Sequence, residues 1–137
     1  MSSDAVFHRI VVPTDFSSCA EGAWALAQRL AAVMRSELLL IHVIAGQNLL
    51  TEATRRWATD ELEECAAKAR AQGLKVHVVL RAGMPYQEIV ALAQNERADL
   101  IIIGHGRRGT DRGLPGSVAH RLLDLAPCPV LTVREPA

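Results

Sequence analysis

Hydrophobic residues follow two different spacings in turn along this chain, and the alternation predicts five strands and four helices. Short apolar runs rich in β-branched residues are typical of strands buried on both faces of a parallel sheet. Segments with apolar residues three and four positions apart are typical of helices with one buried face. The predicted strands are Phe7–Val12, Glu37–Ile44, Leu74–Leu80, Asp99–Ile103 and Val130–Val133. The predicted helices follow Ser18, cover Leu50–Gln72, run from Pro85 to Asn95, and open at Ser117.

Residues with known preferences for helix ends mark these helices. Ser18 and Glu21 have the spacing of a capping box, and Gly73 stands where a helix C-terminus favours glycine. Pro85 lies near the first position of the third helix. The buried face of the first helix is predicted to contain Ala23, Leu26, Ala27, Leu30 and Ala31. The inward face of the second is predicted to contain Ala53, Trp57, Leu62, Cys65, Ala66 and Ala69.

Strands and helices that alternate in this way predict an α/β fold. The expected form is a doubly wound parallel five-stranded sheet with helices on both faces, because each parallel crossover needs a helix to return the chain. No linker or repeat interrupts the pattern, so residues 1–137 are expected to form a single domain. Ligands of such sheets bind beyond the carboxyl ends of the strands. Those ends carry Pro13–Asp15, Val43–Ile44, Arg81–Gly83 and Gly104–Gly106.

The segment between the fourth strand and the last helix is rich in glycine, with Gly104, Gly106, Gly109 and Gly113 ahead of Gly116. A strand that leads through such a loop into a helix N-terminus is a common phosphate-binding arrangement, because free backbone N–H groups and the helix dipole attract anions. Arg107, Arg108 and Arg112 outweigh Asp111, so the loop is net positive. Ser117 is predicted to cap the last helix. The same glycines also fit a plain turn.

Several of these segments together resemble the universal stress protein family in its nucleotide-binding form. Gly106 is followed by nine residues and then Gly116-Ser117, and the chain closes with Pro129–Val133, as in the glycine motif and last strand of that family. Val11–Ser17 and Leu40–Val43 are also similar to the family. In one departure, only His105 separates Gly104 from Gly106, where the family has two residues.

This resemblance implies the strand order 3-2-1-4-5 and a site for ATP, or for AMP or ADP, with Mg²⁺ brought by the nucleotide. It implies that the main chain at Asp15 and Val43 contacts adenine or ribose, and that the glycine-rich loop holds the phosphates. It also implies a homodimer through Val130–Val133, whose exposed sheet edge invites pairing. The candidate nucleotide-binding residues are Pro13, Thr14, Asp15, Val43, Ile103, Gly104, His105, Gly106, Arg107, Gly116, Ser117 and Val118.

Some of these candidates have a second role that fits the sequence. Asp15 is placed to cap the first helix or, since a serine further on can do so, to accept a hydrogen bond from adenosine. Thr14 fits a turn as well as a phosphate-side hydroxyl. Arg107 and Arg108 fit contact with terminal phosphates or with solvent. The position of His105 in the glycine-rich loop favours a solvent-facing histidine.

Composition limits the classes of partner. The 15 basic and 15 acidic residues balance, which gives no electrostatic footprint for nucleic acid or an anionic membrane. No apolar run reaches the ~18 residues of a membrane span, and no signal peptide is expected. Cys19, Cys65 and Cys128 share no disulfide or metal spacing, which favours buried thiols in a reduced, cytoplasmic setting. The histidines lack metal-ligand spacing too, so no protein metal site is expected.

The sequence carries no catalytic motif of the common nucleotide-dependent enzymes or of the serine hydrolases. GxxxxGK[ST] and GxSxG are absent, and Gly104–Gly109 spells GxGxxG after the fourth strand rather than after the first. The expected function is a nucleotide-sensing regulator of the stress response that acts on an unknown protein partner, with little or no catalysis. Two alternatives are a nucleotide-free interaction module of the same fold and a weak ATPase or nucleotidyl enzyme.

Overall fold

Five parallel strands form one sheet in the described part of the chain, in the order β3-β2-β1-β4-β5. The computed structural model describes residues 6–46, 51–105 and 117–134. Its strands are β1 Arg9–Pro13, β2 Glu37–Ile44, β3 Lys75–Ala82, β4 Leu100–His105 and β5 Val130–Arg134. Its helices are α1 Ser18–Met34, α2 Glu52–Ala71, α3 Pro85–Asn95 and α4 Ser117–Leu125. The predicted α/β fold and the implied strand order are confirmed.

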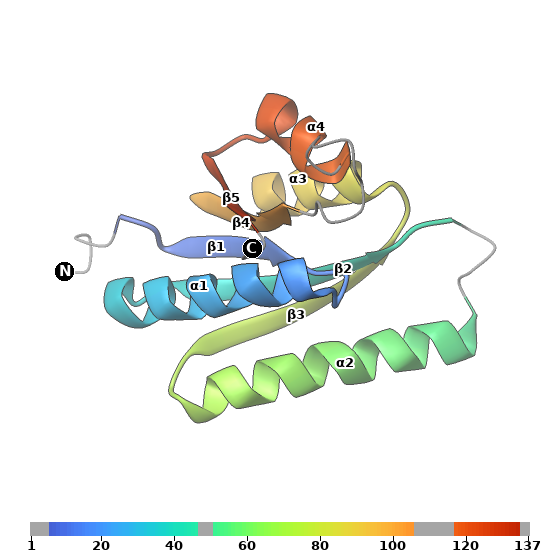
Figure 1. Ribbon diagram of the computed structural model, residues 1–137, viewed down its shortest axis with the longest axis horizontal. Helices are drawn as coiled ribbons and strands as arrows, with labels where there is room; N and C mark the ends of the chain where they lie inside the picture. The colour runs from blue at the N-terminus through green and yellow to red at the C-terminus, as the bar shows by residue number, and fades with distance from the viewer. Residues whose placement is uncertain (1–5, 47–50, 106–116, 135–137) are drawn as a thin grey trace.

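Helices cover both faces of the sheet, with α1 and α2 on one side and α3 and α4 on the other (Figure 1). Neighbouring residues of a strand point to opposite faces, so the apolar strands supply two separate cores. The core under α1 and α2 contains Ile10, Val12, Leu38, Leu40, Ile102, Ala27 and Leu62. The core under α3 and α4 contains Val11, Ile41, Ile101, Ile103, Ile89 and Leu122.

The N-terminus of α1 is capped by Ser17 rather than by Ser18. Ser17 Oγ accepts a hydrogen bond from the Ala20 N–H at 3.3 Å, and Ser18 is already helical. Both serines have suitable chemistry, but the backbone decides between them. Phe16 has a φ of +65°, and this turn leaves Ser17 in the extended conformation of a cap. The prediction for Gly73 is confirmed, since it follows the α2 C-cap with a φ of +91°.

The predicted inward face of α2 is partly wrong. The buried residues are Ala58, Leu62, Ala66 and Ala69, whereas Cys65 is half-buried. Ala53 is exposed and Trp57 is 51% exposed. At about 100° per residue, Ala53 lies about 180° and Trp57 about 140° around the helix from Leu62, so neither can share its face. On α1, Leu26 and Leu30 are half-buried, and Ala20 and Trp24 are more deeply buried than either.

Four strands, β1, β3, β4 and β5, extend further toward the carboxyl edge of the sheet than the sequence predicts. β4 does not end before Gly104, because Gly104 and His105 continue the parallel ladder opposite Val133 and Arg134. β1 includes Pro13 as its last residue, opposite Ile41. Proline is tolerated at this end, since the next residue restores the ladder when the Thr14 N–H donates to the Ile41 carbonyl at 2.8 Å. β3 also runs on to Ala82.

Candidate functional site

A cleft of about 420 Å³ opens at the carboxyl edge of the sheet, beside β1 and β4. The strand order reverses between these two strands, and this is where doubly wound sheets bind their ligands. The volume lies within the range of small-molecule sites. The lining residues are Pro13, Thr14, Asp15, Ser17, Cys19, Ala20, Ile41, His42, Val43, Ala45, Pro85, Ile89, Ile103, Gly104, Val118 and Ala119.

The cleft brings together seven of the twelve residues that the sequence nominated for nucleotide binding. These are Pro13, Thr14, Asp15, Val43, Ile103, Gly104 and Val118. Gly106, Arg107 and Gly116 lie outside the described residues. Ser117 begins α4, and its side chain lies outside the described part of the chain. His105 does not line the cleft.

Two helix N-termini border this cleft. Cys19 and Ala20 come from the first turn of α1, and Val118 and Ala119 come from the first turn of α4. The first turn of a helix presents backbone N–H groups and the positive end of the helix dipole. No lysine or arginine is among the described lining residues. An anionic group in the described part of the cleft would therefore be attracted by the positive ends of the helix dipoles rather than by side-chain cations.

The connection between β1 and α1 is held by hydrogen bonds within itself. The Phe16 N–H donates to Thr14 Oγ1 at 2.9 Å, and the Ser17 N–H donates to Asp15 Oδ1 at 3.0 Å. Asp15 therefore supports the turn just before the helix, while Ser17 makes the cap itself. Thr14 likewise uses its hydroxyl oxygen in the turn. Both side chains have a structural role beside any contact with a ligand.

Gly104 is required by packing at the rim of the cleft. A Cβ atom at this position would lie 2.5 Å from the Cys19 carbonyl oxygen and 3.0 Å from the Ala20 nitrogen. Only a residue without a side chain lets the first turn of α1 approach β4 so closely. This close packing of helix on strand places the α1 N-terminus beside the cleft.

His42 is the most informative lining residue that sequence reasoning passed over. Its Nδ1 lies 2.8 Å from the Thr14 carbonyl oxygen, and its ring contacts two aromatic side chains. The ring centroid is 4.7 Å from that of Phe16 and 6.4 Å from that of Trp57. A signal was available, because a histidine inside an apolar strand needs a polar partner when it is half-buried.

His105 differs from its expected place in solvent. It is the last residue of β4 and half-buried, and its Nε2 is buried without a hydrogen-bond partner among the described residues. The extension of β4 by pairing with β5 explains this, because it draws His105 into the edge of the sheet.

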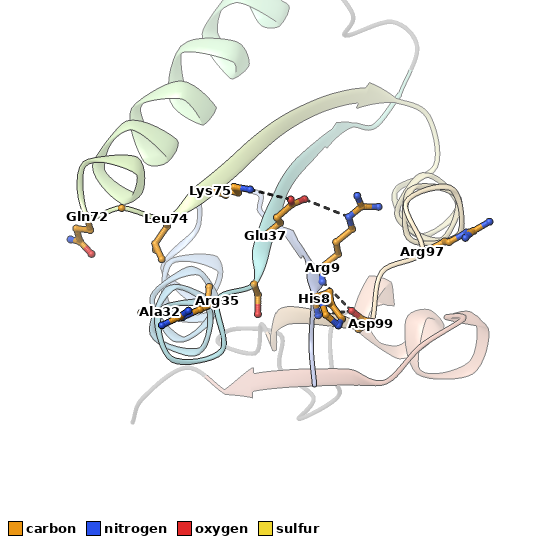
Figure 2. Close-up of a pocket in the computed structure, with 13 residues that line it drawn as sticks. His8, Arg9, Ala32, Arg35, Glu37, Gln72, Leu74, Lys75, Arg97 and Asp99 are labelled. Atoms are coloured by element: carbon orange, nitrogen blue, oxygen red, sulfur yellow. Dashed lines mark hydrogen bonds and ion pairs between the residues drawn. The ribbon is translucent and has the colours of Figure 1, made fainter. Parts of the chain in front are cut away.

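A larger open hollow of about 740 Å³ lies at the opposite, amino edge of the sheet. Several of its charged groups are engaged with one another, since Glu37 lies between Arg9 and Lys75 (Figure 2). The two ion pairs measure 3.5 and 3.8 Å. The Asp99 carboxylate accepts from the backbone N–H groups of His8 and Arg9 at 2.6 and 3.0 Å. Arg97 points away from this group (Figure 2). We assign the hollow a structural role, since its acidic groups tie strand starts together.

Neither a cluster of metal ligands nor a membrane-spanning helix is found in the described part of the chain. Among residues 6–46, 51–105 and 117–134, no three His, Cys, Asp or Glu side chains gather closely enough to hold a metal ion. Within the same residues, no helix combines the length and the apolar character needed to cross a membrane.

Comparison with known proteins agrees with this geometry. The model of the universal stress protein family matches residues 7–134. Among curated proteins, the chain is 31% identical to the universal stress protein MJ0531 of Methanocaldococcus jannaschii, over 98% of this chain and 86% of that protein.

Two similar solved structures contain adenine nucleotides. A universal stress protein in complex with cAMP superimposes with a TM-score of 0.76 and 26% identity, over 96% of this chain and 99% of that one. The universal stress protein from Archaeoglobus fulgidus in complex with dAMP gives a TM-score of 0.73 and 25% identity, over 93% and 98%.

Proposed function

The chain belongs to the universal stress protein family, and from this membership and its cleft we propose that it binds ATP, or AMP or ADP, as a regulator of the stress response. The observation that carries the proposal is the cleft at the strand-order reversal, bordered by the α1 and α4 N-termini. Its described lining consists mainly of apolar side chains and backbone atoms, and such a surface suits adenosine. Two similar proteins contain cAMP and dAMP, and both ligands carry adenine.

In this proposal the adenosine lies against Pro13–Asp15 and Val43, and the phosphates extend toward Gly104 and the start of α4. Ile103 and Val118 supply apolar contacts from the two sides. His105, Gly106, Arg107, Gly116 and Ser117 remain candidates for the phosphate end. Mg²⁺ arrives with the nucleotide, because its phosphates supply the oxygen ligands that this ion prefers.

The proposal also includes a homodimer through β5. This strand is at the edge of the sheet, and its Leu131 is 38% exposed. Leu123 and Leu125 of α4 are exposed as well. Exposed apolar side chains beside an unpaired strand edge favour association with a second copy. The dimer would act in the cytoplasm on a protein partner that responds to nucleotide occupancy.

Little or no catalysis is expected of this cleft. Its described side chains capable of proton transfer are Asp15, Cys19 and His42. Asp15 accepts from the turn, and His42 Nδ1 is directed at the Thr14 carbonyl. No described lysine or arginine is available there to stabilise a transferring phosphoryl group. Slow ADP formation that disappears in Asp15→Ala would instead favour a weak ATPase.

The test uses the same substitution in the two hollows. Ala45 is exposed and lines the cleft, and Ala32 is exposed and lines the hollow at the amino edge. We expect isothermal titration calorimetry to show ATP and AMP binding by the wild type and by Ala32→Trp, and none by Ala45→Trp. Nucleotide retained after purification is removed first and identified by chromatography. Unchanged binding by Ala45→Trp would exclude the cleft, and a wild type that binds neither nucleotide would favour the nucleotide-free interaction module.

A further inference from the structure

We infer that His42 is a positioning residue for adenosine, which acts by fixing the Thr14 carbonyl and with it the peptide that leads into Asp15. The inference rests on the proposed nucleotide binding and adds a side chain that determines the shape of the site. His42 comes from β2, whereas the turn that it fixes follows β1. The contact therefore joins two strand ends that the sequence separates by 28 residues.

Both main-chain groups of Thr14 are bound to β2. Its N–H donates to the Ile41 carbonyl at 2.8 Å, and its carbonyl oxygen lies 2.8 Å from His42 Nδ1. A carbonyl oxygen only accepts, so Nδ1 carries the proton of this hydrogen bond. With both groups held, the peptide planes on either side of Thr14 have little freedom to rotate. The next backbone groups in the turn are those of Asp15, at the place proposed for adenosine.

Aromatic packing fixes the imidazole ring that makes this bond. Phe16 lies 4.7 Å from the ring, and Trp57 of α2 contacts Phe16 edge-on at 5.3 Å. The three rings form one cluster on the α1 and α2 side of the turn, since Phe16 packs against the core on that side. Val43, the next residue of β2, points to the other side. The ring thus supports the turn, and the proposed ligand would lie against the main chain that it holds.

The aromatic cluster also stabilises the unusual backbone conformation of Phe16. A bulky residue rarely adopts a positive φ, and the value of +65° has an energetic cost that surrounding contacts must offset. The Thr14 Oγ1 bond to the Phe16 N–H, the two ring contacts and packing against the core offset this cost. His42 supplies one of these ring contacts and also the bond to the Thr14 carbonyl, so its removal takes two supports from the turn at once.

The experiment compares two amides at position 42. In His42→Asn the side-chain nitrogen occupies the place of Nδ1, two bonds from Cβ. In His42→Gln the same amide is displaced by one methylene. We expect His42→Gln to bind AMP and ATP about tenfold more weakly than the wild type, the size of one hydrogen bond to a fixed group. His42→Asn is expected to stay within about threefold of the wild type. The loss should be the same factor for both nucleotides, because the turn faces adenosine rather than phosphate.

His42→Phe completes the set, because it keeps an aromatic ring in the cluster but has no donor. It should match His42→Gln in affinity, while its thermal unfolding stays cooperative. Equal affinity of all three variants and the wild type would overturn the inference and leave nucleotide binding intact. A loss in His42→Asn as large as in His42→Gln would also overturn it. A wild type that binds neither AMP nor ATP would remove the proposed function and the inference together.

Discussion

Gly104→Ala tests whether this glycine is needed for the packing of α1 on β4 or only for contact with a ligand. The Cβ atom added at Gly104 would lie 2.5 Å from the Cys19 carbonyl oxygen, 2.6 Å from the Cys19 carbonyl carbon and 3.0 Å from the Ala20 nitrogen. All three are backbone atoms in the first turn of α1, so no side-chain rotation can relieve the contact. Either α1 or β4 must move. A glycine needed only for contact with phosphate would show no such conflict in the free protein.

The size of the effect follows from these distances. Ordinary contact begins near 3.4 Å, so the shortest distance must increase by roughly 0.9 Å. Insertion of one methyl group into a tightly packed place costs about 1–3 kcal/mol, which lowers Tm by about 4–12 °C for a chain of this length. We therefore expect Gly104→Ala to unfold at a lower temperature in the absence of any nucleotide. The α1 N-terminus would also be displaced, so the proposed nucleotide binding should weaken.

Two other glycines provide matched controls for the same substitution. At Gly22, inside α1, an added Cβ meets only Val133 Cγ1 at 3.9 Å, so alanine should stabilise by about 0.5–1 kcal/mol. At Gly73 nothing lies within 4 Å, but the φ of +91° makes alanine unfavourable by about 1 kcal/mol. Urea unfolding of the four proteins should rank Gly22→Ala above the wild type, then Gly73→Ala, then Gly104→Ala. A Gly104→Ala protein as stable as the wild type would refute the packing argument.

Three further predictions concern other parts of the molecule. Leu131→Glu should convert the proposed dimer to monomer in sedimentation velocity. Val33→Glu, at a position of α1 that is 81% exposed, should leave the dimer unchanged. A dimer that persists in Leu131→Glu would place the interface elsewhere. Burial raises the pKa of the Cys65 thiol, with Glu61 and Glu64 adding to the shift, and burial followed by Asp99 raises the pKa of Cys128. Both thiols should react slowly with iodoacetamide at neutral pH and faster as pH rises through the raised pKa, and rapid reaction of either at pH 7 would contradict this. Asp99→Ala should lower the free energy of unfolding by about 1–3 kcal/mol, measured in urea, because it leaves the His8 and Arg9 N–H groups without their carboxylate acceptor.

The course of the chain was predictable because each strand and helix carries its own pattern. Leu38–Val43 has the apolar pattern of a buried strand, and Gly73 stands where a helix C-terminus favours glycine, so local rules and tertiary packing agreed. The family resemblance supplied the strand order, which no local pattern contains. Most of the cleft then followed, since the carboxyl ends of parallel strands meet at one edge.

The misassigned positions have two causes: some depend on contacts with distant segments, and others on the local backbone or on the phase of a helix. Ser17 and Ser18 are equivalent as caps until the backbone at Phe16 selects one. His105 looked like a loop residue because its β5 partner, Arg134, follows it by many positions in the sequence. Trp57 looked like a core residue, yet the phase of α2 directs it toward Phe16. His42 was passed over because its importance comes from a carbonyl at the end of another strand.

The side of the cleft proposed for adenosine is fixed from three directions before any ligand enters. Gly104 lets the first turn of α1 pack on β4, His42 holds Thr14 from β2, and Asp15 Oδ1 closes the turn toward Ser17. A site formed in advance loses little conformational entropy on binding, so each contact contributes more of its energy to affinity. In the proposed arrangement this side faces adenosine rather than phosphate, so its contacts do not depend on the number of phosphates. If the proposed nucleotide binding holds, any preference among AMP, ADP and ATP arises beyond the adenosine, and variants of the β1–α1 turn should weaken the binding of all three by one common factor.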